Sequence, residues 1–141
     1  MFNKRSLFAF LLTLGTASVW AQAPAQPGEL TVQSKGDISY VSGGVGASEQ
    51  EALKKVRSDY NLWLTFAVTG TGAFLADVPV TISDKSGQAL LEAVSAGPYL
   101  YARVPAGTYR VSADNEGQVQ TRTVTVPASG GVPEVFEWPR Q

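Results

Sequence analysis

The 141-residue sequence contains no cysteine and no histidine. Without these residues the chain cannot build a Ser–His or Cys–His nucleophile, nor an ordinary zinc or copper site. Disulfides are excluded as well, so one apolar core must hold the folded chain together. We therefore expect no metal site and no cofactor.

The sequence also lacks an excess of charge of either sign. Lys and Arg number 11 and Asp and Glu number 12, which gives a net charge of −1. A nucleic-acid-binding protein normally carries a strongly basic patch or a basic overall charge. This balance therefore predicts no nucleic-acid partner.

The N-terminal residues have the pattern of an export signal. Lys4 and Arg5 precede an apolar run over residues 7–19, which ends shortly before Ala21. A basic start, a short apolar run and a small residue at the cleavage position are typical of a secretory signal peptide, and the run is too short for a membrane span. The pattern predicts cleavage after Ala21. It predicts no lipid anchor, because the cysteine that would carry one is absent.

After the predicted signal peptide, residues 22–28 are rich in Pro, Gln and Ala, a composition that predicts a flexible linker. No internal repeat or second domain is apparent. The predicted organisation is a signal peptide over 1–21, a linker over 22–28 and one domain over 29–141. We expect this domain in the periplasm or outside the cell, without a membrane span.

The segment from Gly97 to Ala113 carries the clearest fold information. Two runs of alternating apolar and polar residues flank Pro105-Ala106-Gly107, a pattern typical of half-buried strands joined by a reversal. Similar runs predict strands near residues 61–69, 73–83, 89–94, 118–126 and 132–138, with short candidates at 29–33 and 37–41. Spacings of about 8 to 12 residues predict a mainly β fold, a two-layer antiparallel β-sandwich of about seven strands.

One helix is expected before the strongest strand. Ser48 and Glu51 have the spacing of a capping box, which predicts a helix over about residues 48–58. Apolar residues at spacings of three and four give it one apolar face: Leu53, Val56 and Tyr60. We expect this short amphipathic helix to pack on the strands; the alternative is a helix that binds a partner.

Two geometries are open for the reversal at 105–107. In a tight hairpin with matched apolar faces, Arg103 would lie opposite Arg110, and like charges facing each other are unfavourable. In an arch between two sheets, the Tyr109 hydroxyl would bond back to nearby backbone, as in a tyrosine corner. We expect the arch, because it avoids the repulsion between the arginines.

The stretches Val78–Gly87 and Gly97–Val111 resemble the carboxypeptidase regulatory-like domains. The shared pattern is a strand, a turn with Asp and Gly, and a Gly–aromatic strand that runs into Pro-x-Gly-x-Tyr; the resemblance covers roughly residues 62–126. It implies a transthyretin-like (prealbumin-like) β-sandwich in a small bacterial exported form that serves as an accessory or interaction module. The hydroxyisourate hydrolases, an enzymatic branch of that fold, work through histidines, which this sequence lacks.

Four residues form the candidate binding site. Trp63 lies on the less apolar face of its strand, and Tyr99 and Tyr101 lie close to Arg103. Aromatic and Arg side chains of this kind are common anchors of interfaces. They support a non-catalytic binding module of the cell envelope, which holds a protein through this face or an edge strand. The alternative is a carbohydrate- or peptidoglycan-binding module that stacks a cell-wall glycan on the aromatics. In a purely structural alternative, the aromatics pack under the helix.

A hydrolase that uses carboxylates is the remaining rival. The acidic residues fall mostly in predicted turns or on the predicted helix, where solvation accounts for them, so we expect no enzyme and no carboxylate-dependent glycoside hydrolase. The polar strand over 118–126 is expected at a sheet edge. There Arg122→Ala should change the free energy of unfolding by less than about half a kcal/mol.

Overall fold

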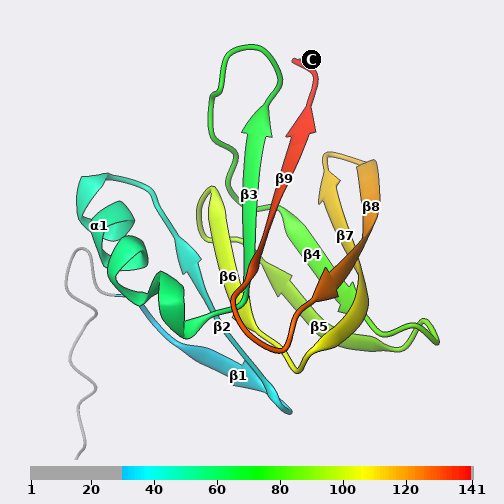
Figure 1. Cartoon of the computed structure of the whole chain (residues 1–141). Helices are drawn as coiled ribbons and strands as arrows, with labels where there is room; N and C mark the ends of the chain where they lie inside the picture. The colour runs from blue at the N-terminus through cyan, green and yellow to red at the C-terminus, as the bar shows by residue number, and fades with distance from the viewer. Residues whose placement is uncertain (1–29, 141) are drawn as a thin grey trace, which may run out of the picture.

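A computed structural model describes residues 30–140. It is mainly β: two open, largely antiparallel sheets and one helical segment, an architecture consistent with a β-sandwich (Figure 1). The described part of the chain has nine strands, more than the seven or so expected. The predicted signal peptide and linker lie outside the described residues.

The first sheet has five strands in the order β1-β2-β6-β3-β9. Their bounds are β1 Gln33–Lys35, β2 Ile38–Gly43, β6 Tyr99–Arg103, β3 Leu62–Val68 and β9 Val132–Trp138. All neighbours are antiparallel except β3 and β9, which run side by side in the same direction. The expectation of a wholly antiparallel sandwich is therefore wrong for this pair. The chain reaches β9 from the other sheet and enters beside the start of β3, where the Val132 amide donates to the Asn61 carbonyl over 3.0 Å.

The second sheet has four antiparallel strands in the order β5-β4-β7-β8. Their bounds are β5 Ala89–Val94, β4 Pro79–Ser83, β7 Gly107–Asn115 and β8 Gln118–Val126. The polar strand β8 lies at the sheet edge, as predicted. Strand β4 begins later than the predicted Ala73, because Asp77 adopts a left-handed conformation with φ of 58°. A proline in a strand predicts an edge strand or a bulge, and this expectation is wrong for Pro79. It is the first residue of the inner strand β4, a position that tolerates its missing N–H.

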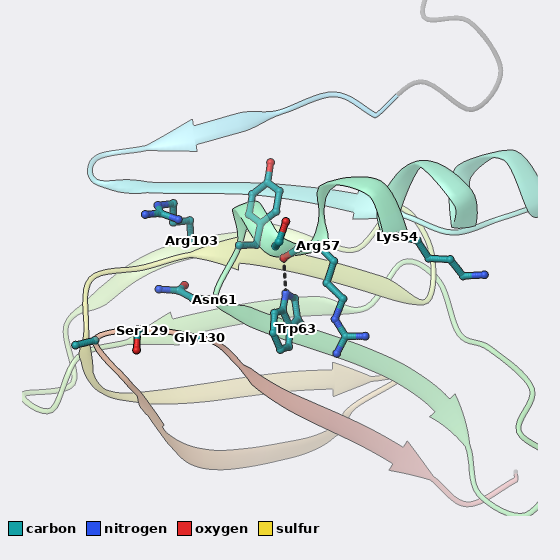
Figure 2. A pocket seen from close by; sticks show the side chains of 10 residues that line it. Lys54, Arg57, Asn61, Trp63, Arg103, Ser129 and Gly130 are labelled. Atoms are coloured by element: carbon teal, nitrogen blue, oxygen red, sulfur yellow. Dashed lines mark hydrogen bonds between the residues drawn. The ribbon is translucent and has the colours of Figure 1, made fainter.

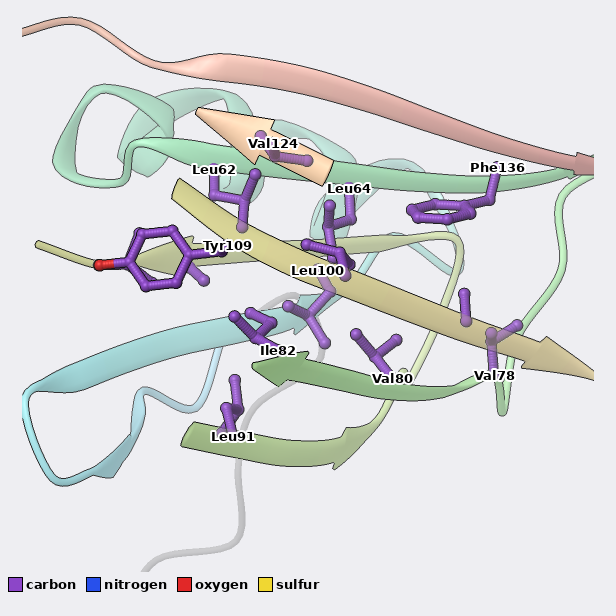
Figure 3. Packing of buried hydrophobic residues seen from close by; sticks show 14 of the residues in the cluster. Leu62, Leu64, Val78, Val80, Ile82, Leu91, Leu100, Tyr109, Val124 and Phe136 are labelled. Carbon is purple, nitrogen blue, oxygen red and sulfur yellow. The ribbon is translucent and has the colours of Figure 1, made fainter. Parts of the chain in front are cut away.

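The core lies between the two sheets (Figure 3). Alternate residues of each strand point into it, because successive side chains of a strand face opposite sides. The five-stranded sheet contributes Leu62, Leu64, Phe66, Leu100 and Phe136, and the four-stranded sheet contributes Val80, Ile82, Leu91, Val111 and Val124. Trp138 closes the end of this core, and its indole N–H donates to the Gln118 carbonyl over 2.8 Å.

The reversal at 105–107 is an arch, as predicted. Strand β6 belongs to the five-stranded sheet and β7 to the four-stranded sheet, so Arg103 and Arg110 do not face each other. The Tyr109 hydroxyl donates to the Pro105 carbonyl, as expected for a tyrosine corner. Asn61 braces the same region: its side-chain amide donates to the Val104 carbonyl and its oxygen accepts from the Val104 amide.

The helix α1 spans Ala47–Val56, and a 3-10 turn, η1, continues it over Arg57–Asp59. The capping box is wrong, because Gly46 occupies the N-cap and no side chain caps the helix. The expected packing is confirmed: α1 lies on the outer face of the five-stranded sheet, where Leu53 and Tyr60 form a buried cluster with Val41 and Tyr101. Within residues 30–140, no helix is both long and apolar enough to cross a membrane.

Candidate functional site

An open cleft of about 540 Å³ lies where the helical segment ends (Figure 2). Its walls come from α1 and η1, from the start of β3, from the loop 127–131 and from the end of β6. The residues that matter for its chemistry are Lys54, Arg57, Asn61, Trp63, Arg103 and Ser129. Three segments far apart in the sequence thus meet at one site: residues 54–63, Arg103 and residues 128–130.

Two exposed arginines, Arg57 and Arg103, lie on opposite sides of the Trp63 ring in Figure 2. Among the described residues, the only ion pairs within 4.0 Å are Lys54–Glu51 and Arg122–Glu134, so neither of these arginines has a carboxylate partner there. Arg103 donates instead to the main-chain carbonyl of Asp59 over 3.1 Å. The cleft therefore presents two positive charges that can attract an anion.

The Trp63 indole lies at the floor of the cleft and is half-buried. Its N–H donates to the Arg57 carbonyl over 2.9 Å, and the Arg57 guanidinium lies 4.2 Å from the ring centroid. At the far edge of the indole, a Cβ on Gly131 would come within 2.6 Å of the ring. The ring is thus held between a cation–π contact and a closely approaching main chain.

A second hollow, of about 210 Å³, adjoins the first and shares Lys54, Arg57 and Trp63 with it. Its further lining is mainly uncharged and lies under and beside the helix: Gln50, Leu53, Thr65, Tyr99, Tyr101 and Pro133. We call the two hollows together the helix groove. Arg103 lines one end of the groove, Arg57 and Trp63 line both hollows, and mainly aromatic and apolar side chains line the other end.

The structure brings all four predicted site residues to the helix groove. Trp63 and Arg103 line the cleft, and Tyr99 and Tyr101 line the smaller hollow. For Tyr101 the purely structural alternative is correct: α1 covers it, it is 7% exposed, and burial raises the pKa of its hydroxyl.

The chain matches no model of a known protein family and no curated protein. The resemblance to the carboxypeptidase regulatory-like domains consequently stays a prediction. What the site does has to be argued from its residues.

Sequence reasoning missed Arg57 and the loop 127–131. Arg57 lies near the end of the predicted helix, and residues 127–131 lie between the last two predicted strands, so neither carries a sequence signal for binding. The packing of Gly131 against Trp63 depends on the crossing from β8 to β9, for which the local sequence gives no signal.

No carboxylate lines the helix groove among the described residues, although Glu51 pairs with the lining residue Lys54 at 3.3 Å. Asp84 is part of a turn: its carboxylate accepts from the Ser86 hydroxyl and from the Gln88 amide, and these bonds lower its pKa. Asp114 similarly accepts from the Gly117 amide over 2.8 Å. Among residues 30–140, no cluster of three or more His, Cys, Asp or Glu could hold a metal ion.

Proposed function

We propose that this protein is a non-catalytic binding module of the bacterial cell envelope, and that it holds a protein partner in the helix groove. One observation carries the proposal: Arg57 and Arg103 flank an open cleft without carboxylate partners among the described residues. The module acts after export, in the periplasm or outside the cell, and works without a metal or cofactor. Its sandwich is of the transthyretin-like kind found in carboxypeptidase regulatory-like domains.

A protein partner suits the helix groove better than a glycan does. Sugar rings stack on open aromatic faces, and such faces are scarce here. The Arg57 guanidinium lies over Trp63, Tyr101 is buried, and the Tyr99 ring is tilted by 53° from that of Tyr101. These rings do not form the flat platform that the carbohydrate alternative requires.

The lining of the groove does not support the alternative of a carboxylate-dependent hydrolase. Glycoside hydrolysis needs two carboxyl groups that flank the bond to be cleaved. No Asp or Glu is among the described residues that line the helix groove. Recognition, rather than turnover, therefore accounts best for the groove.

The edge of β9 is a poorer binding surface than the helix groove. Pro133 has no N–H to offer a further strand. Two side chains of β8 bind the outward carbonyls of β9: Arg122 donates to the Val135 carbonyl and Gln120 donates to the Glu137 carbonyl. An edge with two outward carbonyls already bonded and one N–H missing is a weaker template for strand addition. This argument favours the groove over β9 as the docking surface.

Site-specific photo-crosslinking in cells that export the full chain tests the proposal. A photoreactive residue at Ser129, in the cleft wall, should yield a discrete adduct with an envelope protein. The same residue at Thr123, exposed on the polar strand β8, is the matched control and should not. The adduct should fade when Arg57→Gln and Arg103→Gln are combined. Equal adducts from both positions, or none from Ser129, would contradict a binding role for the groove.

A further inference from the structure

We infer that the helix groove recognises an acidic, extended polypeptide segment, with carboxylates bound at Arg57 and at Arg103 and a nearby apolar side chain in the smaller hollow. The inference rests on the proposed function and adds the chemical class of the partner. It starts from the unequal lining of the groove: Arg103 lines only the cleft, whereas the smaller hollow adds only uncharged residues to the Lys54, Arg57 and Trp63 that both hollows share.

The cationic end is suited to a carboxylate. Each guanidinium offers five N–H donors in a planar fork that matches a carboxylate or a phosphate oxygen pair. Arg57 already stacks on Trp63, and Arg103 is tethered to the Asp59 carbonyl. Because both side chains are partly held in place, less conformational entropy is lost when an anion binds to either of them.

The small positive charge of the cleft limits the kind of anion that it can bind. The chain as a whole has a net charge of −1, and the cleft offers two arginines without carboxylate partners. Nucleic acids and anionic membranes are bound through larger sets of basic residues. One or two carboxylates on an otherwise uncharged ligand complement this site.

The smaller hollow explains why we favour a polypeptide over an isolated anion. Its lining from Thr65, Tyr99 and Pro133 offers apolar contact beside the arginines. Alternate side chains of an extended peptide point the same way and are about 7 Å apart, so a carboxylate and an apolar side chain can project together from one face. A free phosphate or a simple carboxylate would leave this hollow unused.

The experiment is a selection from a random heptapeptide library displayed on phage, with the protein purified after export as the target. The Arg57→Gln, Arg103→Gln double variant serves for counter-selection. We expect the enriched peptides to carry Asp or Glu within two or three positions of an apolar residue. Enrichment of neutral or basic peptides, or none beyond the double variant, would overturn the inference.

Calorimetry on the best synthetic peptide completes the test. Its glutamine analogue and each single arginine variant should bind at least about tenfold more weakly, since each change removes a charged partner. Arg110→Gln, on the other sheet, should bind like the unaltered protein. Inorganic phosphate that competes as well as the peptide would reduce the site to a general anion site and overturn the inference. If the Ser129 adduct forms but acidic peptides fail, the partner class is wrong and the proposed function stands; if both fail, both are wrong.

Discussion

The hydroxyl of Tyr109 donates a hydrogen bond to the carbonyl oxygen of Pro105, four residues earlier in the chain. The bond closes the arch by which the chain leaves the five-stranded sheet and enters the four-stranded one. The Tyr109 ring packs in the core between the sheets. The Tyr109 side chain thus both holds the arch between the two sheets and fills part of the core.

Tyr109→Phe separates these two roles. It removes the hydrogen bond but keeps the ring, so we expect a loss of about 1 kcal/mol in the free energy of unfolding. Tyr109→Ala also leaves a cavity and should cost about 3 to 5 kcal/mol. Urea melts measure both values. A loss below about 1 kcal/mol for the alanine variant would contradict the buried position of the ring.

The structure changes the expectation for Arg122. From the polar character of its strand, the sequence predicts that Arg122 contributes little to the free energy of unfolding. Its guanidinium pairs with Glu134 at 3.0 Å, donates to the Val135 carbonyl and lies 4.7 Å from the Phe136 ring centroid. It therefore connects β8 in one sheet to β9 in the other. We expect Arg122→Ala to cost about 1 to 2 kcal/mol, because hydrogen bonds of a charged group are lost at a partly exposed site.

The control for Arg122 is Arg110→Ala, since Arg110 is exposed on the neighbouring strand β7. That substitution should stay within about 0.5 kcal/mol of the unaltered protein. Equal stability of the two variants in urea would show that the connection between the sheets contributes nothing measurable.

Gly131→Ala tests how closely the loop 127–131 packs on the cleft floor. A Cβ there would approach the Trp63 ring to 2.6 Å, so the ring or the loop must shift. We expect a loss of about 1 to 3 kcal/mol from overpacking and a changed Trp63 emission spectrum. Ser129→Ala, two residues away, adds no atoms and should leave the spectrum unchanged. An unaltered spectrum in Gly131→Ala would place the indole elsewhere.

Alkaline pH should destabilise the fold through its buried tyrosines. Burial raises the pKa of Tyr101 and of Tyr109, and burial together with the nearby Asp59 carboxylate raises the pKa of Tyr60. A pKa raised in the folded state contributes stability that is present below the unfolded value of about 10 and is lost as the pH rises through the folded value. Melts should therefore show falling stability above about pH 10, and Tyr101→Phe should weaken the decline. An identical decline in that variant would contradict the burial of its hydroxyl.

Much of the fold could be predicted because alternation in the sequence reports directly which face of a strand is buried. Leu62, Leu64 and Phe66 all point into the core, and the repulsion between Arg103 and Arg110 correctly favoured the arch. The parallel pairing of β9 with β3 could not be predicted, because strand direction depends on where the chain crosses between sheets. The capping box failed because Gly46, with φ of 94°, is the N-cap, so the helix begins two residues earlier than a side-chain cap at Ser48 would place it.

The candidate site was predictable only in part. Aromatic side chains beside an arginine led to Trp63, Tyr99, Tyr101 and Arg103, which all line the helix groove on the five-stranded sheet. Which of them stay accessible depends on where the helix lies, and the helix covers Tyr101. Arg57 became a candidate only when η1 placed its guanidinium over the Trp63 ring.

The most direct test of the account is a ¹⁵N–¹H NMR titration of the exported protein with an acidic peptide from the library selection. The account predicts that shifts cluster on residues of the helix groove, including the side-chain N–H groups of Trp63, Arg57 and Arg103, while β7 and β8 stay unchanged. Shifts centred on the four-stranded sheet, or none at saturating peptide, would contradict it.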